Sequence, residues 1–323
     1  MLYDFLRWIA GIALHWFYSD IRVVGQGRVP AGGPIIVAAN HPNALVDALV
    51  AGWILPRRLS ITAKATLVEN PVLAVLFRML GIVPLRRVSD ERRKDLEGTL
   101  DPSRNEGAFD RVMHVLKESG VVLIFPEGKS HNQPTIAPLR TGLARIALQA
   151  RDNNGIHGIR ILPLGLKFQA KGEPNSVVIA EFGEPIDVDA LGGVKVEELT
   201  ALVEKRLRGV ADLTAEDVFV ARTGESRVPG LKKSLLRVVA LWGEWVHRFP
   251  IQAARNMAIR KGGDEDQPAM LTIVYGLGII ALYYFIVGIV AGLVGGFLLA
   301  LVLILALGTG AYWAAFKDRP RGY

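Results

Sequence analysis

A histidine and an aspartate stand close together in the segment AANHPNALVDAL, at positions 41 and 47. Pro42 disfavours helical backbone at the residue before it, so we expect His41 in a turn and a helix that begins at Asn43, a good N-cap. Side chains on a helix lean toward its N-terminus, which lets the carboxylate of Asp47 reach back to the His41 ring. An imidazole held in this way can take a proton from a hydroxyl, as a general base does. A capping aspartate beside an incidental histidine is the competing interpretation of these two residues alone.

Two further segments place charged residues directly after apolar runs. GIVPLRR ends in Arg86 and Arg87, and planar guanidinium groups match the oxygens of a phosphate. FPEGKSH follows another apolar run and presents Glu127, Gly128 and Lys129 in one turn. Taken singly, each segment is also what a surface turn at a strand end would contain.

Short apolar runs that alternate with helical patterns are expected to position these residues. The runs are nearly continuous in hydrophobicity, which is typical of strands buried on both faces. Strands that alternate with helices predict an α/β domain with a mixed, largely buried central sheet flanked by helices. The predicted strands are IRVVG, PIIVAAN, GIVPL, VVLIF, IRILPLGLKF and SVVIAEF.

The order of these segments resembles one known family. HPNALVD, GIVPLRR, FPEGKSH and ILPLGL are similar, in this order, to the four sequence blocks of the glycerol-phosphate and lysophosphatidate acyltransferases. The resemblance covers about residues 25–186. It implies transfer of a fatty acyl group from acyl-CoA or acyl carrier protein to a hydroxyl of a glycerol phosphate, with no metal or other cofactor.

The resemblance implies a role for each matching position. His41 would be the general base and Asp47 its partner. Pro163, in the fourth block, would contribute to the acyl-donor site. The residues expected to bind the phosphate and glycerol of the acceptor are Arg86, Arg87, Glu127, Gly128, Lys129 and Lys64.

Two features depart from the usual pattern of this family. Most members separate the histidine and the aspartate by four residues, whereas five intervene here, and the third block usually reads FPEGTRS. Both variants resemble the fungal-type branch, which acylates glycerol 3-phosphate or dihydroxyacetone phosphate and has C-terminal membrane segments. Glycerol 3-phosphate is therefore the expected acceptor. The alternatives are lysophosphatidate as acceptor, phospholipid remodelling, and an inactive lipid-binding scaffold.

The whole chain contains no cysteine, which excludes disulfides and thiolate chemistry. The N-terminal part of the chain is apolar. Asp4 and Arg7 interrupt the first 17 residues, and no small-residue cleavage site follows them. We therefore expect an interfacial helix over residues 1–19 rather than a secretory signal. Residues 20–215 are expected to form the acyltransferase domain.

The C-terminal part is expected to enter a membrane. Residues 270–316 contain no charged side chain, and about 20 residues suffice for one span, so two transmembrane helices with a turn near Gly295 and Gly296 fit within 269–316. Basic residues flank this run on both sides, and the positive-inside rule then places both ends on the cytoplasmic side. We expect a multi-pass membrane protein whose catalytic domain and tail, 317–323, are cytoplasmic.

The net charge of +7 is concentrated just before the apolar run. Nine lysines and arginines against two glutamates between Arg222 and Lys261 account for all of it. Apolar residues recur there at steps of three and four, which predicts an amphipathic region over 216–268 that lies on anionic lipid. The alternative is that the stripe packs on the catalytic domain, and no nucleic-acid partner is expected. The stripe comprises Leu231, Leu235, Val238, Trp242, Trp245 and Phe249.

Overall fold

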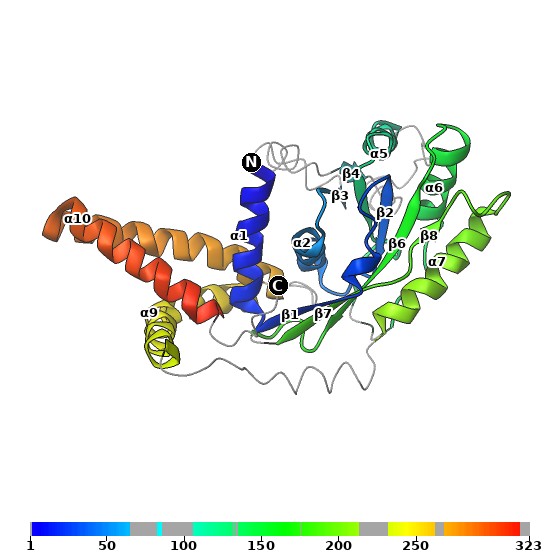
Figure 1. The fold of residues 1–323 in the computed structure, drawn as a ribbon. Coiled ribbons are helices and arrows are strands. Elements are labelled where there is room, and N and C mark those ends of the chain that lie inside the picture. Colours follow the sequence, from blue (N-terminus) through cyan, green and yellow to red (C-terminus); the bar gives the residue numbers. More distant parts are fainter. Residues whose placement is uncertain are drawn as a thin grey trace, which may run out of the picture.

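The computed structural model describes residues 2–64, 83–85, 106–131, 133, 135–174, 176–212, 232–261 and 268–316. The eight strands among these residues form one sheet in the order β1-β7-β6-β2-β5-β3-β4, with β8 paired to β6 (Figure 1). The strands are β1 (Asp20–Val24), β2 (Ile35–Ala39), β3 (Leu59–Lys64), β4 (Val83–Leu85), β5 (Val121–Ile124), β6 (Arg160–Phe168), β7 (Val177–Phe182) and β8 (Ile186–Asp187).

The sheet is mixed, as predicted. Strands β6, β2, β5, β3 and β4 run parallel to one another, whereas β6 is antiparallel to β7 and β8. The five residues of β2 are all buried, since helices cover both faces of the sheet at its centre. The carboxyl ends of the five parallel strands meet at one edge, which we call the carboxyl edge.

Helices pack on the two faces of the sheet in two groups. On one face, α1 (Leu2–Phe17) and α2 (Ala44–Ile54) build a core with Val37, Leu123 and Leu164. On the other face, helices α5 (Glu106–Lys117), α6 (Gly142–Asp152) and α7 (Val196–Ala211) pack on Ile36 and Val122. The short helix η1 (Gln26–Arg28) follows β1.

The first helix docks on this core with its second half. Leu14 and Phe17 are buried there, while Phe5 and Trp8 near its start are exposed. Part of α1 is thus an ordinary core helix, and its placement at a membrane interface stays a prediction.

The last two helices pack on each other and reach away from the sheet. In Figure 1, α9 (Lys232–Lys261) lies against α10 (Pro268–Phe316), whose two arms fold back on each other. Gly296 interrupts α10 with non-helical backbone at φ 78°, at the position where the sequence predicts a turn. Within the described residues, α10 is the only helix long and apolar enough to cross a membrane, and whether it does so stays a prediction. The tail, 317–323, lies outside the described residues.

Three residues of the predicted apolar stripe face outward, and we call them the outward stripe of α9. Val238, Trp245 and Phe249 are each more than 60% exposed, so these three residues do not pack on the acyltransferase domain. Trp242 of the predicted stripe instead lies against Gly310 of α10. On the opposite side of α9, the buried His247 accepts a hydrogen bond at Nε2 from the hydroxyl of Tyr284, at 2.9 Å.

Candidate active site

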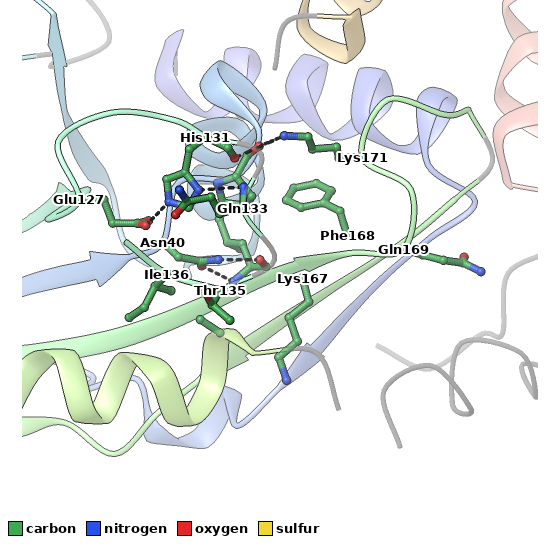
Figure 2. Close-up of a pocket in the computed structure, with 13 residues that line it drawn as sticks. Asn40, Glu127, His131, Gln133, Thr135, Ile136, Lys167, Phe168, Gln169 and Lys171 are labelled. Carbon is green, nitrogen blue, oxygen red and sulfur yellow. Dashed lines mark hydrogen bonds and ion pairs between the residues drawn. The ribbon is translucent and has the colours of Figure 1, made fainter. Parts of the chain in front are cut away.

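The turn that carries His41 begins where β2 leaves the sheet. The side chain of Asn40 extends the pairing of β2 with β6, because its Nδ2 donates to the carbonyl of Leu166 at 2.9 Å and its Oδ1 accepts from the Leu166 N–H at 2.7 Å (Figure 2). This double contact fixes the last residue before the turn. His41 therefore emerges at the carboxyl edge, as the sequence predicts.

The structure brings His41 and Asp47 together. Nδ1 of His41 lies 2.9 Å from Oδ2 of Asp47, and the same oxygen accepts the Asn43 N–H at 2.7 Å. The Asp47 side chain has no exposed surface, whereas that of His41 is 11% exposed. A carboxylate acceptor at Nδ1 favours the tautomer that leaves Nε2 unprotonated, and among the described residues nothing pairs with Nε2. Nε2 is thus the nitrogen suited to take a proton.

Burial dominates the electrostatics of Asp47. Burial raises the pKa of this carboxyl above its ordinary value, while the hydrogen bond and charge of His41, the Asn43 N–H and the charge of Lys171 act in the opposite direction. Its second oxygen, Oδ1, has no hydrogen-bond partner among the described residues. Asp47 is therefore held by its partners rather than by solvent.

The ring of Phe125 fixes the plane of the His41 imidazole. The two rings are stacked, with centroids 3.9 Å apart and an angle of 11° between their planes. Phe125 directly follows β5, the neighbour of β2 in the sheet. The base is thus held at Nδ1 by a carboxylate and on one ring face by an aromatic side chain.

Glu127 holds the same turn through hydrogen bonds from the backbone. Its Oε1 accepts the backbone N–H of His41 at 2.7 Å, and its Oε2 accepts the N–H of Ala137 at 2.6 Å and that of the His131 ring at Nε2. The His131 tautomer is consistent with this, because Nδ1 accepts the N–H of Gln133 at 3.2 Å. The Glu127 side chain is fully buried, and both of its oxygens are engaged by the protein.

The other predicted residues of the third and fourth blocks lie at different depths. Gly128 has φ +80°, which favours glycine, and it closes the turn by donating its N–H to the Phe125 carbonyl at 3.0 Å. Lys129 follows it and is exposed. Pro163 lies inside β6, opposite Ala38, where it is buried, so the structure does not bring it next to the His41 ring.

Of Lys64, Arg86 and Arg87, the structure describes only Lys64, at the end of an outer strand of the carboxyl edge. Lys64 ends β3 and pairs in register with Leu85, the last residue of β4. Because β5 separates β3 from β2, the backbone of Lys64 lies about 10 Å along the edge from β2, at roughly 4.8 Å per strand. Arg86 and Arg87 come directly after β4 but lie outside the described residues.

A cavity of about 240 Å³ lies beside the His41 turn, toward β6 and not toward β3 (Figure 2). Polar walls come from Asn40, Glu127, His131 and Lys171, and Phe168 is among its apolar walls. Within the described part of the chain, neither the His41 ring nor Asp47 lines it. The cavity is therefore next to the base without containing it.

The sequence did not point to several residues that build this site. Phe125 and His131 stand in the quoted segment FPEGKSH, and His131 follows Glu127 by four residues, a spacing that could have been noticed. Tyr18 and Lys171 carry no such signal, because they meet Asn43 only through the fold. Asn43 occupies the N-cap position of α2, as predicted, but its side chain makes no capping hydrogen bond and instead donates to these two residues.

Residues 20–167 match the family model described as Acyltransferase. The chain is 24% identical to glycerol-3-phosphate O-acyltransferase 1 of Saccharomyces cerevisiae, over 58% of this chain and 35% of that protein. It is 23% identical to the chloroplastic 1-acyl-sn-glycerol-3-phosphate acyltransferase LPAT1 of Arabidopsis thaliana, over 51% of this chain and 40% of that protein. The chain thus spans well under half the length of these curated relatives.

A solved structure is also similar. The 1-acyl-sn-glycerophosphate acyltransferase PlsC of Thermotoga maritima superposes with a TM-score of 0.49 at 23% identity, over 64% of this chain and 78% of that one.

Proposed function

Because residues 20–167 carry an acyltransferase domain of the glycerolipid family, we propose that the chain acylates a hydroxyl of glycerol 3-phosphate with His41 as general base. In this reaction the acceptor oxygen attacks the carbonyl carbon of an acyl thioester, from acyl-CoA or acyl carrier protein. Nε2 of His41 takes the hydroxyl proton, the C–S bond breaks, and the proton passes to the thiolate that leaves. No enzyme nucleophile is needed, since the acceptor oxygen itself attacks.

The observation that carries this proposal is the pairing of a buried carboxylate with Nδ1 of His41 while Nε2 has no partner among the described residues. Asp47 orients the ring and stabilises the imidazolium that forms during proton transfer. A capping aspartate beside an incidental histidine would not require this contact. An inactive lipid-binding scaffold would not require it either.

Glycerol 3-phosphate is favoured as acceptor by two features. Lys64 ends β3 at the carboxyl edge, Arg86 and Arg87 follow β4 in the sequence, and the chain is similar to a fungal glycerol-3-phosphate acyltransferase. Glu127, Gly128 and Lys129 complete the proposed acceptor region, where Glu127 acts through the His41 turn. The similarity to a plant 1-acylglycerol-3-phosphate acyltransferase makes lysophosphatidate the second candidate.

Attachment to a membrane fits an enzyme whose product is an amphiphile. We propose that the arms of α10 cross the bilayer and that the outward stripe of α9 lies on anionic lipid, with the catalytic domain on the cytoplasmic side. The exposed stripe of α9, the basic residues around it and the apolar length of α10 support this arrangement.

The test is a comparison of acceptors with the purified chain. Glycerol 3-phosphate and lysophosphatidate are assayed with acyl-CoA and, separately, with acyl carrier protein thioesters. The proposal expects a kcat/KM for glycerol 3-phosphate at least 10-fold above that for lysophosphatidate, and Arg87→Ala should raise the acceptor KM far more than the donor KM. If the preference is reversed, lysophosphatidate becomes the proposed acceptor. If the chain transfers an acyl group to neither acceptor, the proposed function is overturned.

A further inference from the structure

Lys171 lies in the loop after β6, beyond residue 167, where the match to the family model ends. Its ammonium group donates a hydrogen bond of 2.7 Å to the carbonyl of Pro42. Its own carbonyl accepts a hydrogen bond of 3.2 Å from Nδ2 of Asn43. A single residue therefore holds the two residues that follow His41 in the turn.

Tyr18 ties the same loop to the end of α1. Its hydroxyl donates to the Lys171 carbonyl at 3.0 Å and accepts from Nδ2 of Asn43 at 2.9 Å. Burial raises the pKa of Tyr18 well above the ordinary value, so the hydroxyl keeps its proton and its donor role at any physiological pH. Lys171 is thus fixed at its backbone while its side chain reaches the turn.

The contacts of Lys171 complete the hydrogen bonding of the turn. The N–H of His41 is held by Glu127, the carbonyl of His41 accepts from the His131 N–H at 3.2 Å, and Lys171 supplies the donor for Pro42. The Pro42 carbonyl is partly buried, and a carbonyl in such a place that loses its donor costs free energy, so this turn is expected to shift when the Lys171 ammonium is removed. A shift of about 1 Å at a catalytic group can cost roughly 100-fold in rate.

We propose that Lys171 is a positioning residue for the acyl transfer, which sets the location of His41 by holding the Pro42 carbonyl. It acts through the turn and touches neither substrate. The proposal rests on the proposed role of His41 as the base. It adds a residue from outside the four sequence blocks to the machinery of the site.

The first experiment compares Lys171→Met with Lys117→Met in the full chain. Lys117 is exposed at the end of α5, near the opposite edge of the sheet, and serves as the matched control. Lys171→Met is expected to lower kcat 10- to 100-fold and to change the KM of either substrate less than 3-fold. A kcat within 2-fold of Lys117→Met would overturn the proposal, and so would a loss that falls on KM alone.

A second variant separates positioning from folding. Lys171 lines the 240 Å³ cavity, so Lys171→Ala leaves space beside the Pro42 carbonyl that a small ammonium ion can enter. Methylammonium or ethylammonium is expected to raise the kcat of Lys171→Ala at least 5-fold over its value without amine. Neither amine should raise the kcat of Lys171→Met, where the side chain fills the space. A Lys171→Ala variant that melts like the wild type and gains nothing from either amine contradicts a role of the ammonium group.

A third readout does not depend on acyl transfer. Diethyl pyrocarbonate modifies unprotonated imidazole, and peptide mass spectrometry gives its rate at His41. Lys171→Met is expected to change this rate at least 3-fold relative to Lys117→Met, and an unchanged rate counts against positioning. If the wild type transfers no acyl group but the rate at His41 still responds to Lys171, the proposed function fails while the positioning role stands.

Discussion

Nδ1 of His41 lies 2.9 Å from Oδ2 of Asp47 although five residues separate them, one more than is usual in the family that the sequence resembles. Between them, the backbone of Ala44 adopts the left-handed conformation at φ 47°. The helix α2 begins there, and Asp47 then points back to the turn. The contact between His41 and Asp47 is thus made across a turn that contains a strained alanine.

Ala44→Gly should relieve this strain. A non-glycine residue in the left-handed region costs about 1–2 kcal/mol, part of which glycine loses again through its greater freedom in the unfolded chain. We expect the melting temperature in detergent to stay equal or rise, with full activity, and Ala44→Val to lower it. A glycine variant that melts clearly below the wild type would contradict the strained alanine.

Asp47→Asn should separate the charge of the carboxylate from its shape. The asparagine oxygen can still accept from His41 Nδ1 and the Asn43 N–H, so the turn persists, while the imidazolium loses its counter-charge. We expect kcat to fall about 10- to 100-fold with KM values nearly unchanged. Steady-state kinetics check this, and wild-type turnover would show that the Asp47 charge is not used.

The same variant should change how stability depends on pH. Because burial raises the pKa of Asp47 in the folded chain, the folded state holds this proton more tightly than the unfolded state. The wild type should therefore lose stability relative to Asp47→Asn as pH rises from about 4 through the raised pKa, and the difference between the two should stop changing at lower pH. Melting temperatures of both proteins between pH 4 and 8 test this. A wild-type melting temperature that rises relative to that of Asp47→Asn as pH rises would contradict the raised pKa.

Glu127→Gln distinguishes support of the turn from direct contact with the acceptor. Both carboxylate oxygens accept protein hydrogen bonds, and a glutamine must turn an N–H toward one of these donors. The expected cost is about 1–3 kcal/mol of stability, together with a lower kcat. The exposed Glu118→Gln is the control. An acceptor KM that rises while the melting temperature and kcat stay constant would instead favour the direct contact that the family resemblance implies.

The sequence predicted the parts of this molecule that depend on local patterns. Its six predicted strands match β1, β2, β4, β5, β6 and β7, and the helix predicted to begin at Asn43 matches α2, because burial and periodicity are visible in single segments. The pairing of His41 with Asp47 followed from the direction of helical side chains. The strands β3 and β8 and the helix α7 were missed, since their patterns are short or largely polar.

The contacts around Asn43 could not be predicted in this way. Its side chain meets Tyr18, 25 residues earlier, and the carbonyl of Lys171, 128 residues later. These contacts take the place of the capping hydrogen bond that an asparagine side chain ordinarily makes at the N-cap. Interactions between distant segments depend on the pairing of β6 with β7 and the docking of α1, which no local pattern reveals.

The outward stripe of α9 should be in contact with lipid. The chain has no cysteine, so Trp245→Cys, at a position that is 74% exposed, can carry a polarity-sensitive fluorophore as its only label. In vesicles with anionic lipid we expect a blue-shifted emission that lipid-borne spin labels quench. Lys205→Cys on α7 is the matched control and should keep an aqueous spectrum. Equal spectra at the two positions would place the stripe in water or on another protein.

The most direct measurement is the single-turnover rate of acyl transfer to glycerol 3-phosphate by purified wild type and His41→Ala, at saturating substrates. We expect the variant to fold, to bind both substrates and to transfer the acyl group roughly 100- to 10,000-fold more slowly, as loss of a general base requires. A His41→Ala protein that transfers the acyl group within a few-fold of the wild-type rate would contradict the assignment of His41 as the base.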